Sequence, residues 1–423
     1  MKTTDTTRHV LVLLPSVQDR SELMPLAEHG YTFHFMDDPA WKSHEPALDG
    51  FDPHAYIERC LALAREVNAA GIFYTHELAN FVAAVLAREL GLPGPTVESI
   101  FLTNHKLYGR ATEMDPIRFK GYALDSDEWR RAVIFPSHVK PVSLFFSLLQ
   151  STVRNEADLE RAVAALRGSI RSWERPFTDL FARYVDQASY PLAAGSPILI
   201  EEFVGDVVSQ HAVEGWSDAD GVPHLWATSD NNYMAGSGAA LDNNSVPSAL
   251  EPEMARRIED LAFATVRRFG MKSGFWNVEV WVREGGKLQI TEVNGRICAT
   301  MTALYRKAYG KSQYPVILKL ACGQPIDPET DAPGEPLCHA AMFGISTARK
   351  GLVKQLINVP EFQRLTTRSE VIQARLMFDP DTNVTWHQTG GRSCVARAWI
   401  SGDSLGQVSR LANEIRASVV TTG

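Results

Sequence analysis

Two glutamates and two asparagines are spaced as they would be if they faced one another across a hairpin. Segments rich in β-branched residues flank Gly285-Gly286, a dipeptide that suits the positive φ angles of a tight two-residue turn. With that turn, Glu279 lies opposite Glu292 and Asn277 lies opposite Asn294, all on one face. Directly opposed carboxylates repel each other, so the pair needs a proton or a cation between its members.

The chemistry that this spacing predicts is the binding of a hard divalent cation. Carboxylate and carboxamide oxygens suit Mg²⁺, which usually brings phosphates with it. The predicted ligands are Glu279, Glu292 and Asn294, with Mn²⁺ as an alternative ion. An exposed hairpin whose glutamates are simply solvated is the other interpretation of the same spacing.

The prediction depends on the register of the two strands. The two-residue turn pairs Val278 with Val293 and Val280 with Thr291 on the other face, which we expect to be the packed one. A three-residue loop would shift the register by one and break the pairing of the glutamates.

Bulk composition narrows the class of protein. The 423 residues carry a net charge of −8 and no basic run, which argues against a nucleic-acid partner. Five scattered cysteines without CxxC spacing indicate neither a disulfide framework nor a zinc site. No apolar run approaches the roughly eighteen residues of a membrane span, and the N-terminus lacks a signal-peptide pattern. We expect a cytoplasmic protein of two or three domains, without a membrane partner.

The first hundred or so residues alternate between short apolar strands and helices. Strands are predicted over 9–15, 31–36 and 71–75, and helices over 55–67 and 77–90. This order predicts a parallel α/β unit, in which ligands bind at the carboxyl ends of the strands. Ser16 and Thr75-His76-Glu77 would then lie on the ligand side, although His76 and Glu77 could equally be an ordinary start of a helix.

The hairpin residues resemble those of a known superfamily. Glu279 followed by Glu292-Val293-Asn294-Gly295-Arg296 resembles the metal-binding end of the ATP-grasp superfamily, in which a glutamate on one strand precedes E-x-N-x-R on the next. The resemblance implies an α/β (α+β) fold with an N-terminal Rossmann-like domain, an ATP-grasp domain and a C-terminal lobe. We divide the chain into an N-terminal α/β domain (1–103), a small subdomain or nucleotide lid (104–196), a large subdomain with the metal site (197–333) and a C-terminal lobe (334–423).

Two lysines resemble the phosphate-binding elements of the superfamily. Lys106 begins a K-x-x-x-R element, with His105 where the superfamily usually has an acid, and Lys140 stands in a V-K-P element. Ser147 lies seven residues after Lys140, at the place of the superfamily's serine, but no glycine accompanies it in the loop 143–149. On composition alone, Lys106 and Arg110 would be interpreted as solvated charges. A helix over 154–167 and an extra helical piece over 168–196, without an assigned role, follow.

A strand predicted over 197–204 carries a set of residues that resembles the adenine hinge. Glu201, Glu202, Phe203 and Val204 match that element, and Gln210 stands where the superfamily has a glutamate. Exposed acids at the end of a strand are the alternative. The stretch 227–247, rich in Gly, Asn and Ser, is predicted to be a mobile loop, and together with the Phe145-Phe146 loop it is a candidate lid.

The resemblance implies a ligase that uses ATP and Mg²⁺. Such an enzyme activates a small-molecule carboxylate as an acylphosphate and couples it to an amine, which releases ADP and phosphate; Lys140 and Arg296 are the expected catalytic residues. Within the superfamily the chain resembles L-amino acid ligases of the bacilysin and dapdiamide type. That branch implies dipeptide synthesis in natural product biosynthesis and allows a homodimer. The alternatives are a carboxylase-type or purine-pathway ATP-grasp ligase, and a non-catalytic nucleotide-binding regulator, which the glycine-less loop would suit.

Overall fold

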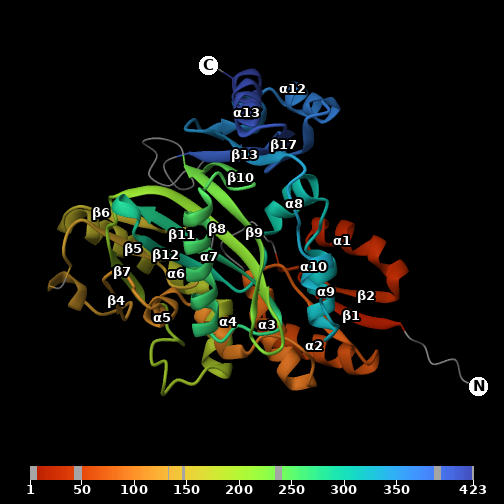
Figure 1. Ribbon diagram of the computed structural model, residues 1–423. Helices are drawn as coiled ribbons and strands as arrows, with labels where there is room; N and C mark the ends of the chain where they lie inside the picture. The colour runs from red at the N-terminus through yellow and green to blue at the C-terminus, as the bar shows by residue number, and fades with distance from the viewer. Residues whose placement is uncertain are drawn as a thin grey trace, which may run out of the picture.

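The computed structural model describes residues 7–41, 50–131, 133–144, 148–233, 241–384 and 392–421. Figure 1 shows the chain running from the N-terminal domain in red, through the central sheets, to the C-terminal lobe in blue. Ser147 and the Phe145-Phe146 pair lie outside the described residues, so their predicted roles stay predictions.

The N-terminal domain contains the parallel sheet that the sequence predicts, with strand order β2-β1-β3. Its helix α3 begins after His76, whose side chain accepts a hydrogen bond from the Leu78 amide, and ends at Gly91 with a left-handed φ of 66°. The elements are β1 Arg8–Leu13, α1 Val17–Leu23, the 3₁₀ helix Met24–His29, β2 Tyr31–Met36, α2 Pro53–Glu66, β3 Gly71–Phe73, α3 Glu77–Leu90, α4 Val97–Asn104 and α5 Lys106–Thr112.

A four-stranded antiparallel sheet with order β4-β7-β5-β6 forms the small subdomain. Val139 of β5 is fully buried against helix α6, while Lys140 at the end of the strand points to the cleft side with Leu199 as its cross-strand partner. The elements are β4 Phe119–Tyr122, the 3₁₀ helix Glu128–Arg131, β5 Ser137–Lys140, β6 Ser151–Val153, α6 Glu156–Tyr184 and β7 Ile198–Glu202.

Helix α6 is longer than the helix predicted over 154–167. It runs without interruption for 29 residues, through Gly168 and Pro176. Its first half packs in the core of the small subdomain through residues such as Ile170, and its second half packs in the N-terminal core through Phe177 and Phe181. Burial at both ends outweighs the cost of a glycine and a proline inside the helix. Residues 168–184 of the stretch 168–196 therefore belong to a helix that connects the two cores.

An eight-stranded sheet with order β12-β11-β8-β9-β10-β13-β17-β15 forms the centre of the molecule. Helix α7 packs across one face of it (Figure 1), where Ile258 and Val266 meet Val278 and Val280 in one core. The polar face of β11 and β12 lies on the other side. The elements are β8 Val207–Ser217, β9 Pro223–Tyr233, β10 Leu241–Val246, α7 Pro252–Arg268, β11 Gly274–Arg283, the 3₁₀ turn Glu284–Gly286, β12 Leu288–Asn294, β13 His339–Thr347, β15 Val371–Leu376 and β17 Ser393–Gly402.

The hairpin β11–β12 has the predicted glutamate pair but not the predicted turn. Arg283 donates its amide to the Lys287 carbonyl across a three-residue turn that includes Gly285 and Gly286, both with positive φ. Near the turn, Val280 pairs with Ile290 rather than with Thr291, so that prediction is wrong.

A β-bulge at Thr291 restores the predicted register beyond that point. Glu279 pairs with Glu292, Val278 with Val293 and Asn277 with Asn294. A three-residue turn alone would have broken these pairs; the turn and the bulge together preserve them.

The stretch 227–247 is not a mobile loop through most of its length. Residues 227–233 belong to β9 and residues 241–246 to β10, which pair as a hairpin with cross-strand partners such as Asn231 and Asn244. Residues 234–240 lie outside the described residues. Pairing of the two strands provides hydrogen-bond partners for the backbone of this polar stretch. Composition alone does not reveal such a pairing.

The remaining helices connect the central sheet to the C-terminal lobe, whose strands β13, β17 and β15 continue that sheet. Among the described helices, none is long and apolar enough to cross a membrane. The remaining elements are the 3₁₀ helix Ala299–Met301, α8 Thr302–Tyr309, α9 Tyr314–Ala321, α10 Pro328–Asp331, β14 Gly351–Leu352, α11 Val353–Leu356, α12 Val359–Arg364, the 3₁₀ helix Leu365–Thr367, β16 Asn383–Val384 and α13 Leu405–Val419.

Candidate functional site

Glu279 and Glu292 are cross-strand partners on the face of the hairpin opposite the packed valines. Gln210 of β8 donates its amide to Oε2 of Glu279 at 2.6 Å and accepts from the Trp281 indole at 2.7 Å, so its orientation is fixed. Burial and the charge of Glu292 raise the pKa of Glu279 to about 7. The structure therefore places Gln210 beside the predicted metal ligand.

Lys106, the first residue of α5, neutralises the other carboxylate. Its Nζ lies 3.0 Å from Oε1 of Glu292 and donates to the Leu144 carbonyl at 2.7 Å. Burial by itself would raise the pKa of Glu292, but the Lys106 cation offsets it and holds that pKa below its usual value. In this arrangement the Lys106 cation favours the ionised form of Glu292, and burial beside that carboxylate favours the protonated form of Glu279.

Lys140 and Arg110 share a single buried carboxylate, that of Glu201. Lys140 Nζ lies 2.8 Å from Oε2, and Arg110 Nε lies 2.9 Å from Oε1. Burial would raise the pKa of Glu201, but these two cations lower it to about 2. Burial lowers the pKa of Lys140. The predicted adenine residue Glu201 thus serves here as the partner of the predicted phosphate lysine.

One pocket brings these charged groups together. Lys106, Lys140 and Glu292 all line it, along with Arg110 and Glu113. The pocket lies between α5, the end of β5 and the strand β12. The predicted phosphate lysines and a predicted metal ligand, which are up to about 190 residues apart in the sequence, therefore meet at one site.

The other predicted hinge residues lie beyond Glu201, at the connection from β7 to β8. Glu202 forms an ion pair with Arg118 at 2.7 Å. Phe203 is 44% exposed and its amide donates to the Pro136 carbonyl at 3.3 Å, and Val204 is half-buried. This connection presents an exposed ring and backbone groups, which suit a flat heterocycle.

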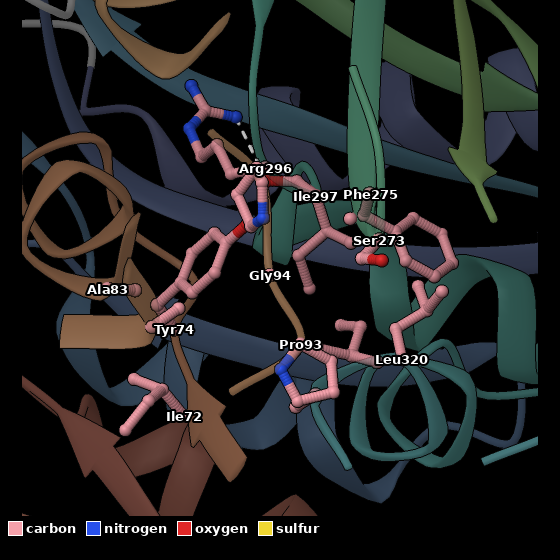
Figure 2. A pocket seen from close by; sticks show the side chains of 15 residues that line it. Ile72, Tyr74, Ala83, Pro93, Gly94, Ser273, Phe275, Arg296, Ile297 and Leu320 are labelled. Carbon is pink, nitrogen blue, oxygen red and sulfur yellow. Dashed lines mark hydrogen bonds between the residues drawn. The ribbon is translucent and has the colours of Figure 1, made fainter. Parts of the chain in front are cut away.

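Arg296 is held by the N-terminal domain. Its Nε donates to Oε1 of Glu77 at 2.7 Å, and Nη1 donates to the Ile297 carbonyl at 2.9 Å. Figure 2 shows Arg296 at the rim of an apolar pocket, with its guanidinium turned away from side chains such as Tyr74. Burial opposes the ionisation of Glu77, but Arg296 lowers the pKa of that carboxyl to about 2. The contact places Glu77 beside a predicted catalytic residue, and its position on the ligand side stays a prediction.

A buried amide network supports the turn between Asn294 and Arg296. Asn80 donates to the Gly295 carbonyl at 3.3 Å and accepts from Asn104 at 2.7 Å. Asn294 itself donates to Asn277 at 3.4 Å. These asparagines orient the third predicted metal ligand and its neighbours.

Two buried acids escaped the sequence analysis. Glu174 on α6 accepts a hydrogen bond from the Ser143 amide at 2.6 Å, and burial raises its pKa to about 7. Glu214 on β8, paired with Asn277, accepts from Gln313 at 3.0 Å and from the Cys298 amide, and burial raises its pKa to about 7. Glu174 is one of several acids in α6, so nothing in the sequence singled it out. Glu214 lies four residues after Gln210 and is the lone acid of β8, which was the available signal.

The donor set fits a hard divalent cation. Two facing carboxylates and the Asn294 carboxamide offer oxygen ligands, and burial and the charge of Glu292 raise the pKa of Glu279, an effect that a cation between the two carboxylates would relieve. No cluster of three or more His, Cys, Asp or Glu suited to a metal occurs in the described part of the chain. Two carboxylates and a carboxamide suit an ion such as Mg²⁺, which usually keeps waters and phosphate oxygens as its other ligands.

Comparisons with known proteins agree on the fold. Residues 133–303 match the sequence model of the ATP-grasp domain. No curated protein matches the chain significantly in sequence.

Three solved structures illustrate the likeness. L-amino acid ligase from Bacillus licheniformis has a TM-score of 0.80 at 16% identity over 99% of both chains. N5-carboxyaminoimidazole ribonucleotide synthetase from Thermus thermophilus has a TM-score of 0.63 at 16% identity, over 98% of this chain and 99% of that one. The biotin carboxylase domain of Hydrogenobacter thermophilus 2-oxoglutarate carboxylase, solved with MgADP and bicarbonate, has a TM-score of 0.64 at 15% identity, over 98% of this chain and 90% of that one.

Proposed function

We propose that this chain, which has the ATP-grasp fold, is an ATP-dependent ligase that joins a carboxylate to an amine. The observation that supports this most is the facing pair Glu279 and Glu292, next to a pocket lined by Lys106 and Lys140. Opposed carboxylates beside two lysines match what a triphosphate and its divalent cation require.

ATP would lie between the small subdomain and the central sheet. The exposed Phe203 and the backbone of the β7–β8 connection are placed to hold the adenine. Lys140 and Lys106 are placed to contact phosphate oxygens as point charges. Both lysines are paired with carboxylates in this structure, so nucleotide binding would exchange those partners for phosphate.

Glu279, Glu292 and Asn294 would hold Mg²⁺. The bound ion would neutralise the triphosphate and the charge that develops on the transferring phosphoryl group. Gln210 would keep Glu279 oriented, since its amide is fixed on the other side by Trp281. Mn²⁺ would suit the same oxygen ligands.

The reaction needs no protein nucleophile. An oxygen of the substrate carboxylate attacks the γ-phosphorus, the bond to the bridging oxygen breaks and ADP leaves. The amine nitrogen then attacks the acyl carbon of the resulting acylphosphate, the carbon–oxygen bond to phosphate breaks, and the amine loses a proton. Arg296, held in place by Glu77, would stabilise an anionic oxygen during these steps by its charge and by the N–H of Nη1 that does not donate to Ile297. Water must be excluded meanwhile, because it would hydrolyse the acylphosphate.

For the substrates we propose an amino acid or related acid and an amine, so that the product is a dipeptide or similar amide. The support is the similarity to L-amino acid ligase over nearly the whole length of both chains. Natural product biosynthesis in the cytoplasm is the setting we expect, and a homodimer the assembly. A carboxylase-type or purine-pathway ligase is a second candidate, because structures of both kinds share the fold.

The test is release of ADP and phosphate by the full chain with Mg²⁺ and pooled amino acids, with mass spectrometry of the products. We expect a new amide and one ADP for each product molecule. Turnover that requires bicarbonate or biotin would support the second candidate. No turnover with any carboxylate and amine mixture would contradict the ligase and favour a nucleotide-binding regulator.

A variant of one metal ligand strengthens the test. Glu292→Ala should abolish turnover while the far-ultraviolet circular dichroism spectrum stays unchanged. Glu284→Ala is the matched control, because Glu284 lies exposed at the tip of the same hairpin. Activity retained in Glu292→Ala would remove the metal assignment.

A further inference from the structure

Arg110 is almost completely buried, with an exposed fraction of 4%, and nearly all its donors are engaged. Nε donates to Glu201 at 2.9 Å, and Nη1 donates to Glu113 at 2.8 Å. The same guanidinium also donates to two consecutive backbone carbonyls, from Nη1 to Ile290 at 2.8 Å and from Nη2 to Thr291 at 3.0 Å. The guanidinium therefore has no free pair of N–H groups with which to bind a phosphate.

The two carbonyls that Arg110 contacts belong to the bulge in β12. Val280 pairs with Ile290 while Glu279 pairs with Glu292, so Thr291 is the extra residue. β12 is the edge strand of its sheet, and its outer carbonyls need partners from outside the ladder.

The bulge decides which way Glu292 points. If the register set by the three-residue turn continued without it, Glu279 would lie opposite Thr291, and Glu292 would lie opposite Val278 on the packed face. The metal pair exists because one additional residue is accommodated between Ile290 and Glu292.

We propose that Arg110 is a positioning residue: it fixes the bulge in β12 that places Glu292 on the same face as Glu279. Through Glu201, which also pairs with Lys140, the same guanidinium ties the strand of the phosphate lysine to the strand of the metal pair. This inference rests on the proposed function, because the direction of Glu292 matters only if Glu279 and Glu292 bind a metal ion. It does not depend on turnover.

Hydrogen exchange tests the inference without any ligand. In Arg110→Lys, an ammonium cannot reach both carboxylates and both carbonyls, so amides in 288–294 should exchange about tenfold faster or more, while those of β13 and β17 stay unchanged. Arg167→Lys is the matched control, because the Arg167 guanidinium of α6 also donates to two backbone carbonyls, those of Leu124 at 2.8 Å and Ser126 at 2.9 Å, and these belong to the small subdomain rather than to β12. Exchange in 288–294 equal to that of the control, or faster exchange spread evenly over the whole chain, would overturn the proposal.

Binding of Mn²⁺ in the presence of ADP, followed by electron paramagnetic resonance, provides the second readout. Arg110→Lys should weaken Mn²⁺ binding about tenfold or more, as expected when a charge-assisted contact is lost. Deletion of Thr291 leaves Val280 opposite Ile290 and Glu279 opposite Glu292 without a bulge. In that background Arg110→Lys should no longer change Mn²⁺ affinity.

The outcomes separate this inference from the proposed function. An equal loss of Mn²⁺ affinity with and without Thr291 would show that Arg110 acts through its carboxylate partners alone, and would overturn the inference. Wild-type protein that binds no Mn²⁺ with ADP would contradict the proposed function, and the exchange of 288–294 would still decide the role of Arg110.

Discussion

Lys106 Nζ lies 3.0 Å from Oε1 of Glu292, so a predicted phosphate lysine and a predicted metal ligand neutralise each other in the structure. The contact joins the start of α5 to the edge strand of the central sheet. Under the proposed function, binding of Mg²⁺ and ATP would separate Lys106 from Glu292, because phosphate would replace the carboxylate as the partner of the lysine and the metal would replace the ammonium as the partner of the glutamate.

Lys106→Met should therefore impair nucleotide use more than folding. Loss of a charge-assisted contact to phosphate is expected to lower kcat/KM for ATP about 10- to 100-fold, measured by ADP release. Lys106→Arg should retain part of the activity. Lys287→Met on the same hairpin, where Lys287 forms an exposed pair with Asp115 at 3.4 Å, should leave kcat/KM unchanged. Equal effects in Lys106→Met and Lys287→Met would contradict the role of Lys106.

Gln210→Glu should make the site more dependent on cations. The substitution replaces the amide that donates to Glu279 with a third acid, and like charges at that distance repel. Without metal, the unfolding temperature should fall; with saturating Mn²⁺, the rise in unfolding temperature should exceed that of wild type. Differential scanning fluorimetry with and without Mn²⁺ measures both. An Mn²⁺-induced shift smaller than that of wild type would place the ion away from Glu279.

Glu174 predicts a pH dependence of stability. Burial raises its folded pKa to about 7 from an ordinary value of 4.5, so the folded state holds an extra proton between these values. The contribution is present below the unfolded pKa and is lost as the pH rises through 7. Burial shifts Glu113, Glu214 and Glu279 in the same direction. The unfolding temperature should therefore fall from about pH 6.5 to about pH 8; below 6.5 the buried His105, whose pKa burial lowers to about 3, has the opposite effect.

Glu174→Gln should remove part of that slope, because glutamine keeps an acceptor for the Ser143 amide and does not ionise. Unfolding temperatures at closely spaced pH values provide the measurement. Glu284→Gln, at an exposed position, is the control. A slope as steep in Glu174→Gln as in wild type would show that Glu174 is ionised in the folded state.

Gly295→Ala should weaken the fold and the site together. A methyl group there would lie 2.6 Å from Cδ1 of Ile100 and 2.8 Å from Oγ1 of Thr103, too close for either atom to stay in place. Overpacking of this kind costs about 1–3 kcal/mol, and the shift would move Asn294 and Arg296. Gly168→Ala, inside α6 with open space around it, should instead stabilise by about 0.5–1 kcal/mol. Denaturant unfolding of both variants measures the two changes in the free energy of unfolding. An unchanged free energy of unfolding in Gly295→Ala would show that Ile100 and Thr103 can move aside for the added methyl group.

The metal hairpin shows how far the sequence could predict the site. Opposed β-branched segments around two glycines predicted the pairing of Glu279 with Glu292, and the structure has it. The turn length was wrong, and the bulge that compensates for it depends on Arg110, about 180 residues away in the sequence. No local pattern reveals a contact of that range.

The other departures have similar physical causes. Composition alone would make Lys106 and Arg110 solvated charges, but they pair with Glu292 and Glu201, which come from two different sheets. The helix predicted to end at 167 continues as α6 because the N-terminal core buries Phe177 and Phe181. Tertiary burial overrides local preference in each case.

The central sheet does not stop where the ATP-grasp domain ends. β10 pairs on one side with β13, and the whole of β13 lies in the predicted C-terminal lobe. Truncation after residue 333 would remove β13 and make β10 an edge strand. Its unpaired backbone amides and carbonyls could then pair with a strand of another molecule. Such a fragment should precipitate rather than work as a minimal enzyme, and a graft of another protein's tail would need a strand in the same place to remain in solution.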